Sequence, residues 1–520
     1  MWKFILFILA ISPIIWLVIS LSGMKMSGFK ACPIALVISL AISLIVWKMP
    51  ALDAVTAGLE GVALALWPIL LVIIAAIFTY NLSIRTGNMD LIKRMLTGIT
   101  ADRRLLVLII AWGFGGFLEG MAGFGTAVAI PASMLYALGF DPLFSAVVCL
   151  VANATPTAFG SIGIPTVTLG QVTGLDSTIL ASTTVFQLFP LIVLTPFLIV
   201  MLTGKSSKAL KGVGLITLVS GLSFAIPEFL VAKYLGPELA AVVGSVCSML
   251  CTIIGVKLKK GCDPKYQMTT ETHGQACGEL PPISPKRAII AWLPFILIFL
   301  FLVLTSKLFP GFHNMLAAIK TSVPIYSGKG ATSYTFTWVA TPGVLIILAT
   351  FIGGAVQGAK FKEMAGVLGT TVKQMTKTII TIVSVMATAK VMGYSGMIST
   401  VATMAVAVTG SFYPVIAPLI GSVGTFITGS ATSSSVLFGK LQTEAASAIS
   451  ANQYWMAASN TCGACCGKII SPQSIAIAVA ATGLDGKDGE ILNKSIKYFI
   501  MFIIITGIII YFGSPLAAYI

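Results

Sequence analysis

The chain has 520 residues, of which 57% are hydrophobic and only 9% are charged. So few charges cannot cover the surface of a soluble protein of this size, so the composition excludes a soluble globular fold and predicts a polytopic membrane protein. The net charge of +15 would suggest nucleic-acid binding in a soluble protein. Here the basic residues stand in short clusters between apolar segments, as in cytoplasmic loops, and we expect no nucleic-acid partner.

Apolar segments long enough to span a bilayer recur along the whole chain, and they predict an all-α membrane protein with about 12–14 transmembrane helices. The first segment, Phe4 to Leu21, lacks a small-residue cleavage site, so we expect a retained helix rather than a signal peptide. The other segments lie at roughly 31–47, 62–80, 105–118, 121–139, 143–170, 179–203, 212–232, 238–256, 288–306, 336–356, 378–396, 398–420, 422–438, 452–481 and 497–513.

The basic clusters lie at 85–104, 205–211, 257–287, 360–377 and 487–497, and the positive-inside rule places them in the cytoplasm. Alternating the spans through these loops puts both termini outside. The most hydrophilic stretch divides the chain near its middle. We therefore expect an N-terminal transmembrane half at 1–256, a cytoplasmic linker at 257–287 and a C-terminal transmembrane half at 288–520.

Two polar, helix-breaking stretches, one in each half, share a pattern. Asn153–Pro165 and Asn460–Pro472 both read Asn, then Gly, Ile and Pro at the same spacing. An interrupted helix survives in a bilayer only where protein or a water-filled cavity receives its freed backbone groups, and two such interruptions are typical of secondary transporters. The stretches after 104 and after 398 are dense in Gly, Pro, Ser and Thr, which predicts re-entrant hairpins. We therefore expect two repeated halves. The sequence does not distinguish repeats of inverted orientation from repeats of parallel orientation.

Glu119 lies in the densest glycine motif of the chain, at 113–126. It stands 15 residues beyond Arg104 and 17 before Tyr136, which places it deep in the bilayer. An intramembrane carboxylate costs at least about 2.5 kcal/mol unless it is protonated, paired or hydrated. We expect a proton carrier or a cation ligand. The alternative is a protonated structural carboxyl bonded to the glycine-rich backbone.

Lys468 is the corresponding cation, centred in the apolar run 455–483 beside the second helix break. A fixed ammonium and the free N–H groups of a half-helix can balance a substrate carboxylate. The alternative, snorkelling to the interface, is awkward because both ends of the segment are distant. Lys390 lies nearer an end of its segment and is the weaker candidate.

Hydroxyl groups beside the two breaks can donate to a carboxylate or accept from a substrate hydroxyl. Their alternative role is as small residues that let helices pack closely. They belong to Thr155 in the first motif and to Thr432, Ser433 and Ser434 in the second half. Asn153, Asn460 and the carbonyls of the broken helices offer oxygen ligands, so sodium stays open as the coupling ion.

No motif supports hydrolysis. Gly393–Gly396 has the shape of an intramembrane serine protease site, but neither histidine, His273 nor His313, lies in a span to act as a base. The chain has no HExxH zinc pair and no phosphate-binding loop. Cys462–Cys466 has a CxxC spacing without a second cysteine pair, so we expect no metal site and no cofactor.

These motifs together resemble the lactate permease family of secondary carriers over nearly the whole length. In the first half the resemblance is carried by Glu119–Thr126, Asn153, Ala158–Gly160, Gly163–Pro165 and Gly170–Gly174. In the second half it is carried by Tyr394–Met397, Thr428–Ser430, Asn460 and Gly467–Ser474.

The resemblance implies a multi-pass protein of the bacterial cytoplasmic membrane that takes up L-lactate, often with D-lactate and glycolate, by proton symport. In this interpretation Lys468 binds the carboxylate of a small monocarboxylate substrate and Glu119 carries the coupled proton. The remaining expected substrate-site residues are Asn153, Asn460, Thr155, Thr432, Ser433, Ser434, Tyr394, Ser395 and Gln473. The alternatives are a sodium-coupled carrier, a carrier of dicarboxylates or other organic anions, and a channel.

The chain departs from the family pattern at three positions. Ala431 and Ser435 stand where we expect Asp and Asn, and Ala127 stands where the family often has Pro. If the Asp that is missing at position 431 takes part in proton coupling or in substrate choice, we expect this protein to differ from the family in that property.

Overall fold

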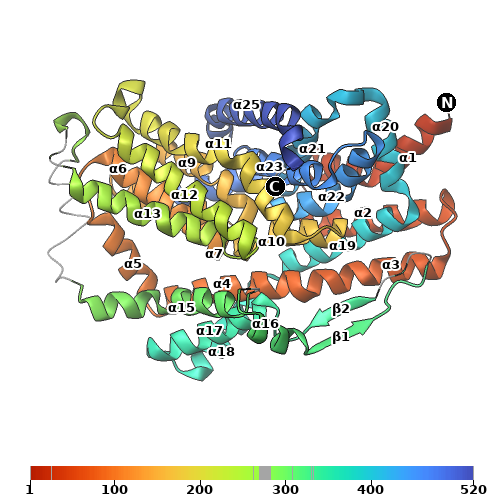
Figure 1. Ribbon diagram of the computed structural model, residues 1–520, viewed down its shortest axis with the longest axis horizontal. Coiled ribbons are helices and arrows are strands. Elements are labelled where there is room, and N and C mark those ends of the chain that lie inside the picture. Colours follow the sequence, from red (N-terminus) through yellow and green to blue (C-terminus); the bar gives the residue numbers. More distant parts are fainter. Residues whose placement is uncertain are drawn as a thin grey trace.

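The computed structural model describes residues 2–24, 26–123, 125–259, 261, 263–268, 283–306, 308–328, 331 and 333–518. This part of the chain is almost entirely helical, with one small antiparallel sheet (Figure 1). It contains twelve helices long and apolar enough to cross a membrane, or up to thirteen with one bent pair. The predicted all-α polytopic fold is therefore confirmed. The centre of the predicted linker, 269–282 with His273, lies outside the described residues.

The chain opens with two helices joined by a π-helical turn, followed by a long interrupted span and a short amphipathic helix. They are α1 (Trp2–Val18), η1 (Ile19–Gly23), α2 (Gly28–Ile45), α3 (Ala51–Leu64), η2 (Ala65–Leu70), α4 (Leu71–Arg85) and α5 (Asn88–Thr97).

A unit made of a hairpin, a broken helix and a long helix then occurs in each half of the chain. In the first half, hairpin 1 consists of α6 (Arg103–Val107), η3 (Leu108–Phe114), α7 (Gly115–Met121) and α8 (Thr126–Ala137). The first broken helix consists of α9 (Pro142–Ala152), η4 (Thr155–Phe159) and α10 (Gly160–Thr173). The long helix that follows is α11 (Ser177–Gly204). In the second half, hairpin 2 is α21 (Tyr413–Thr428) and α22 (Ala431–Ala448), and the broken helix is α23 (Gln453–Lys468) and α24 (Pro472–Thr482), before α25 (Asp488–Gly513) and η8 (Ser514–Ala518). The first broken helix bends by 49°.

The elements between the two units complete the protein. They are η5 (Ser207–Leu210), α12 (Gly214–Tyr234), α13 (Ala240–Leu258), η6 (Pro264–Tyr266), α15 (Pro285–Leu304), α16 (Pro310–Ala317), β1 (Lys320–Val323), β2 (Tyr334–Thr337), α17 (Pro342–Val356), α18 (Phe361–Gln374), α19 (Thr376–Ser395), α20 (Met397–Thr409) and η7 (Gly410–Phe412). The strands pair with Lys320 opposite Thr337 and Val323 opposite Tyr334.

The region after 398 is divided more finely than the predicted spans at 398–420 and 422–438. It forms α20 and the two arms of hairpin 2, where a hairpin was expected, because Gly410 and Gly429 interrupt the helices with positive φ angles of 54° and 71°. The strands were not expected, since each has only four residues and lies in a polar connection.

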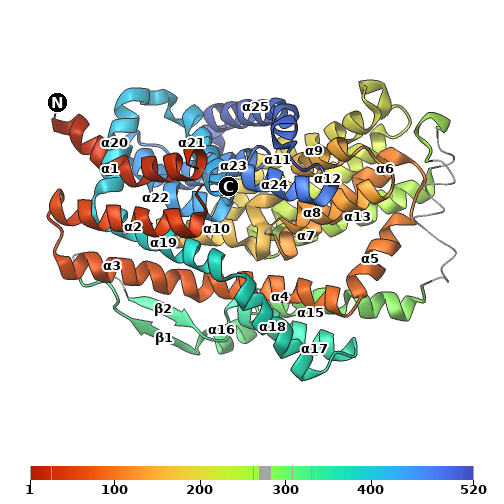
Figure 2. The same cartoon turned by 180° about the vertical axis from the view of Figure 1, so that it is seen from behind.

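The two halves interlock. Figures 1 and 2 show α3, α4, α15, α17 and α18 along one side of the molecule, with the hairpins and broken helices in its body. Helix α10 of the first half packs against α22 of the second, and α24 of the second packs against α8 and α9 of the first. Each hairpin therefore lies beside the broken helix of the opposite half, as well as beside its own.

Candidate functional site

The tip of hairpin 1 rests on the break in the first broken helix. The Ser161 Oγ donates a hydrogen bond to the Ala122 carbonyl oxygen at 2.7 Å. Gly125 has a φ of 89°, and a Cβ at this position would clash with Ile477 of α24. A side chain here would therefore be strained by the backbone conformation and would push against α24 of the second broken helix.

The first break, residues 153–163, is held by its own polar groups and by unusual backbone. Thr157 Oγ1 donates to the Asn153 carbonyl oxygen at 2.7 Å, and Asn153 Nδ2 donates back to Thr157 Oγ1 at 3.4 Å. Ser161, Ile162 and Gly163 are consecutive left-handed residues, with φ angles of 48°, 59° and 74°. Non-glycine residues in this region cost about 1–2 kcal/mol each, a strain that is typical of functional sites.

The second break, residues 469–471, is held by the tip of hairpin 2. Lys468 Nζ donates to the Gly429 carbonyl oxygen at 2.9 Å. The left-handed Gly429 leaves room for Gln473, with which a Cβ would clash. Pro472 occupies the first turn of α24, where a missing N–H costs nothing because that group has no partner inside the helix.

Glycines let hairpin 2 approach the second broken helix closely. A Cβ at Gly463 or Gly467 of α23 would clash with the carbonyl oxygens of Pro418 or Ser422 on α21, and a Cβ at Gly421 with that of Asn460. This small-residue contact brings two backbones together in lipid without a large apolar driving force. It places the tip of hairpin 2 beside Lys468.

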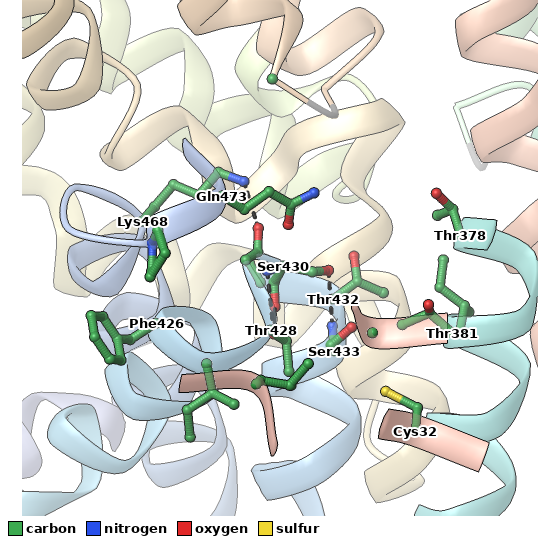
Figure 3. Close-up of a pocket in the computed structure, with 18 of the residues that line it drawn as sticks. Cys32, Thr378, Thr381, Phe426, Thr428, Ser430, Thr432, Ser433, Lys468 and Gln473 are labelled. Atoms are coloured by element: carbon green, nitrogen blue, oxygen red, sulfur yellow. Dashed lines mark hydrogen bonds between the residues drawn. The ribbon is translucent and has the colours of Figure 1, made fainter. Parts of the chain in front are cut away.

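Both tips and both breaks meet at one cavity of about 420 Å³. Glu119 and Lys468 line it from the two halves, with 4% and 8% of their surfaces exposed. In Figure 3 Lys468 and Gln473 lie on one side, Thr378 and Thr381 of α19 lie on the other, and the hydroxyls of hairpin 2 lie between them. The hydroxyl-bearing residues that line the cavity are Ser27, Thr157, Ser161, Thr378, Thr381, Thr428, Ser430, Thr432 and Ser433.

The lining can hold one small anion with a hydroxyl group. An ammonium and several hydroxyls donate to a carboxylate, and a neighbouring hydroxyl accepts from the substrate. Glu119 Oε1 faces Gly160, where a Cβ would lie 2.5 Å away. Glu119 Oε2 is buried and has no hydrogen-bond partner among the described residues, so this carboxyl is available for a proton.

The expected site residues divide into three groups. Lys468, Glu119, Thr432, Ser433 and Gln473 line the cavity together. A second group is buried and does not line the cavity, and it consists of Asn153, Thr155, Asn460 and Ser434. Tyr394 and Ser395 lie near the far end of α19 and do not line it.

The second group keeps several polar atoms without protein partners. Among the described residues, neither side-chain polar atom of Asn460 has a hydrogen-bond partner, nor do Asn153 Oδ1, Thr155 Oγ1 and Thr461 Oγ1. Asn460 lies inside the continuous helix α23, whereas Asn153 stands at the start of the first break. The two motifs are equivalent in sequence but differ in local structure.

Tyr394 binds a different carboxylate. Its hydroxyl donates to both oxygens of Glu60 on α3, at 3.0 and 3.1 Å, and Lys390 Nζ pairs with Glu60 Oε1 at 2.6 Å. Its ring stacks on Tyr326 with centroids 3.8 Å apart. Helix α3, helix α19 and the loop that joins β1 to β2 are held together by Glu60, Lys390, Tyr394 and Tyr326.

Sequence reasoning did not predict that α19 and the connection between α1 and α2 supply residues to the cavity wall. Lys377, Thr378 and Thr381 line the cavity, and Lys377 Nζ lies 5.3 Å from the centre of the Phe29 ring. In the sequence, Lys377 is one of several basic residues in the cluster 360–377. No neighbouring residue distinguishes it from the other lysines of that cluster. Its place depends on the packing of α19 against α2.

The three neighbouring cysteines have separate partners. Cys462 Sγ lies 3.2 Å from Gln187 Oε1, Cys465 Sγ lies 4.0 Å from the Thr155 carbonyl oxygen, and Cys466 Sγ lies 3.5 Å from Thr506 Oγ1. Within the described ranges no three His, Cys, Asp or Glu side chains are grouped so as to hold a metal ion.

The amino-acid sequence matches a known protein family. A family model described as L-lactate permease matches residues 6–517. An L-lactate permease of Streptococcus iniae is 52% identical over 458 residues, which are 88% of this chain and 94% of that protein. The glycolate permease GlcA and an L-lactate permease, both of Escherichia coli (strain K12), are 36% and 35% identical, each over 96% of this chain and 94% of their own length.

Among solved structures, the YdaH transporter of Alcanivorax borkumensis matches 83% of this chain and 88% of its own at 13% identity, with a TM-score of 0.35. That score is too low to support an argument.

Proposed function

Because the chain belongs to the L-lactate permease family, we propose that it is a secondary active transporter that takes up L-lactate, and with it D-lactate and glycolate, by proton symport. The chain is a permease and not an enzyme. The proposal depends above all on one observation, that Lys468 and Glu119 reach the same cavity from opposite halves. A buried cation and a buried acid beside two helix breaks supply one group for the anion and one for the proton.

In the proposed binding mode, the substrate carboxylate lies between Lys468 and the hydroxyls of hairpin 2. The substrate hydroxyl bonds to the side chains of α19, Thr378 and Thr381, across the cavity. A cavity of about 420 Å³ is near the lower end of the roughly 300–1,000 Å³ range of ligand pockets, which suits a small substrate. A single deep lysine suits one carboxylate better than two.

We propose that Glu119 is protonated when substrate binds, so that the lactate anion and the proton cross together. The cavity is lined by Lys377 and by the connection between α1 and α2, which the positive-inside rule assigns to the cytoplasm. The described conformation is then open inward. The same orientation puts both termini outside a bacterial cytoplasmic membrane.

Sodium coupling is the second candidate, and buried side-chain oxygens that have no hydrogen-bond partner among the described residues favour it. Asn153 Oδ1, Asn460 Oδ1 and Thr155 Oγ1 are hard oxygen ligands of the kind that bind group I and II cations. A dicarboxylate carrier would need a second cation for the second carboxylate, and Lys377 at the cavity wall is the candidate for that role.

Counterflow in proteoliposomes tests the substrate. Vesicles loaded with unlabelled L-lactate should accumulate labelled L-lactate transiently, and glycolate should compete. A protein that exchanges succinate but not lactate would be a dicarboxylate carrier, and one without saturable exchange would be a channel.

Imposed gradients test the coupling ion. An inward pH gradient without sodium should drive lactate uptake, whereas an inward sodium gradient at equal pH should not. Uptake driven only by sodium would overturn the proton assignment and leave the substrate assignment intact.

A further inference from the structure

A second carboxyl group is buried in the same part of the protein. Glu228 lies on α12, two turns before its end, and only 1% of its surface is exposed. Its Oε2 has no hydrogen-bond partner among the described residues. An acid inside a transmembrane helix is expensive, and such residues mark ion and proton pathways.

Glu228 packs where α12 meets α13. A Cβ at Gly244 of α13 would lie 2.9 Å from the Phe224 carbonyl oxygen and 3.0 Å from Glu228 Cβ, so glycine lets α13 approach α12 closely at this point. One turn earlier on α12, Phe224 lies 4.6 Å from the Trp112 ring and against Gly116 of hairpin 1. Glu228 is therefore built into the helix layer directly behind the arm that carries Glu119.

No charged side chain in the described part of the chain pairs with Glu228. Helix α11, which packs against α12, has no titratable residue, and α13 offers Cys247, Cys251 and Lys257. On α12 itself the cation is Lys233, whose Nζ lies over the Phe229 ring at 5.8 Å.

Packing links the two acids. Glu119 lies on α7, three residues after Gly116, and Glu228 lies on α12, four residues after Phe224, whose ring lies against Gly116. Helix α13 packs against both α7 and α12. Glu119 faces the cavity already described.

A second cavity lies beyond Glu228. It has a volume of about 160 Å³ and surrounds the α12–α13 connection, Leu235–Leu239, with Glu238 and His313 in its wall. Leu235 is seven residues beyond Glu228, or about 10 Å along the helix. The alternation of spans puts this connection outside, opposite the face that carries Lys377.

We propose that Glu228 is a second proton-carrying residue, which receives a proton from the outer cavity and passes it to Glu119. In this step the O–H bond on Glu228 breaks and one forms on the Glu119 carboxylate. The Glu228 carboxylate is then reprotonated from the outer cavity. The inference rests on the proposed proton coupling and adds the route by which the proton enters.

Lactate-dependent proton influx into vesicles that contain a pH-sensitive dye tests this route. Glu228→Gln should slow that influx by at least about tenfold and flatten its dependence on external pH, since a positioned proton donor contributes about 10²–10⁴-fold. Lactate counterflow at equal pH should stay within about threefold of wild type, because exchange of bound lactate and proton needs no new proton. Glu228→Asp keeps the acid and should recover most of the influx.

Glu363→Gln is the matched control, since that carboxyl is exposed and pairs with Arg85 at 3.0 Å on the surface. Wild-type influx and an unchanged pH profile in Glu228→Gln would overturn this inference. A wild-type protein that exchanges lactate without moving protons would instead overturn the proposed coupling.

If Glu228→Gln does not fold, the wild-type protein supplies the test. A hydrophobic carbodiimide modifies protonated carboxyls in apolar surroundings, and peptide mass spectrometry locates the adduct. We expect an adduct on Glu228, and its formation should slow lactate-dependent proton influx more than lactate counterflow. No adduct on Glu228, or an equal loss of both activities, would overturn the proposal.

Discussion

Lys468 Nζ donates to the carbonyl oxygen of Gly429 at 2.9 Å, which joins the second helix break to the tip of hairpin 2. The bond occupies one of the three donors of the ammonium and leaves two for other partners in the cavity. The same contact therefore holds the tip in place and orients the cation.

Lys468→Ala should raise the apparent KM for lactate by about tenfold or more, because hydrogen bonds to charged groups contribute about 1.5–3 kcal/mol. Counterflow of labelled lactate measures the change. Lys440→Ala is the control, since Lys440 is 40% exposed and pairs with Glu444 on the outside of α22. A folded Lys468→Ala protein with a wild-type KM would remove Lys468 from the binding site.

Glu119→Gln should keep lactate exchange and lose accumulation, since the amide resembles a permanently protonated acid. Counterflow at equal pH and uptake under a pH gradient separate the two activities. Size-exclusion profiles should match wild type, which excludes a folding defect. Accumulation of lactate by the Gln variant would show that another group carries the proton.

Gly463→Ala should lower stability by about 1–3 kcal/mol, because an added methyl in a close-packed contact forces the backbones apart. The methyl would clash with the Pro418 carbonyl oxygen of hairpin 2. Thermal unfolding in detergent measures the loss. Gly366→Ala in α18 meets no atom within 4 Å and should be neutral or stabilising by up to about 1 kcal/mol. Equal effects at both positions would contradict the packing argument.

Asp102, at the foot of hairpin 1, should make stability depend on pH. Burial by itself would raise the pKa of Asp102, but hydrogen bonds from Arg104 and Lys259 outweigh it and hold that pKa below its usual value. A lowered pKa stabilises the folded protein above the unfolded pKa, about 3.9, and this contribution is lost as the pH falls through the folded pKa.

Below about pH 4, we therefore expect the melting temperature of the wild type to decrease more with falling pH than that of Asp102→Asn. The variant is less stable and lacks the pH-dependent contribution of this carboxylate. Scanning fluorimetry between pH 3 and 7 measures both curves. Parallel curves would mean that Asp102 adds no pH-dependent stability.

Lys390→Met should destabilise the protein by about 3–5 kcal/mol, because it leaves the Glu60 carboxylate buried without its cation. The double variant Glu60→Gln with Lys390→Met removes both charges and should recover part of the loss. Chemical unfolding of the four proteins in a double-mutant cycle measures the coupling. Additive effects would mean that the pair contributes little.

The features of this protein that depend on local sequence could be predicted. Runs of apolar residues fix the spans, and the clustering of Gly, Pro, Ser and Thr fixes the hairpins and breaks. Glu119 and Lys468 were identifiable because a charge in a span is rare enough to indicate a function. Glu228 carries the same signal but was missed, because it lacks the glycine-rich or helix-breaking motif that surrounds Glu119 and Lys468.

The features that depend on long-range packing could not be predicted. Thr378 and Thr381 reach the cavity only because α19 packs against α2. Tyr394 was grouped with the substrate site by motif, yet the pairing of α19 with α3 gives it Glu60 as a partner. Asn460 matches Asn153 in spacing, but its helix continues to Lys468 before it ends.

The interlocked packing of α10 on α22 and of α24 on α8 has a consequence for biosynthesis. About 300 residues separate the first break from the second, and a ribosome that adds about 5–20 residues per second needs about 15–60 s to make them. During that interval α10 lacks α22, and α8 and α9 lack α24, although these helices pack together in the folded protein. Fragments cut at the linker should therefore require co-expression to assemble.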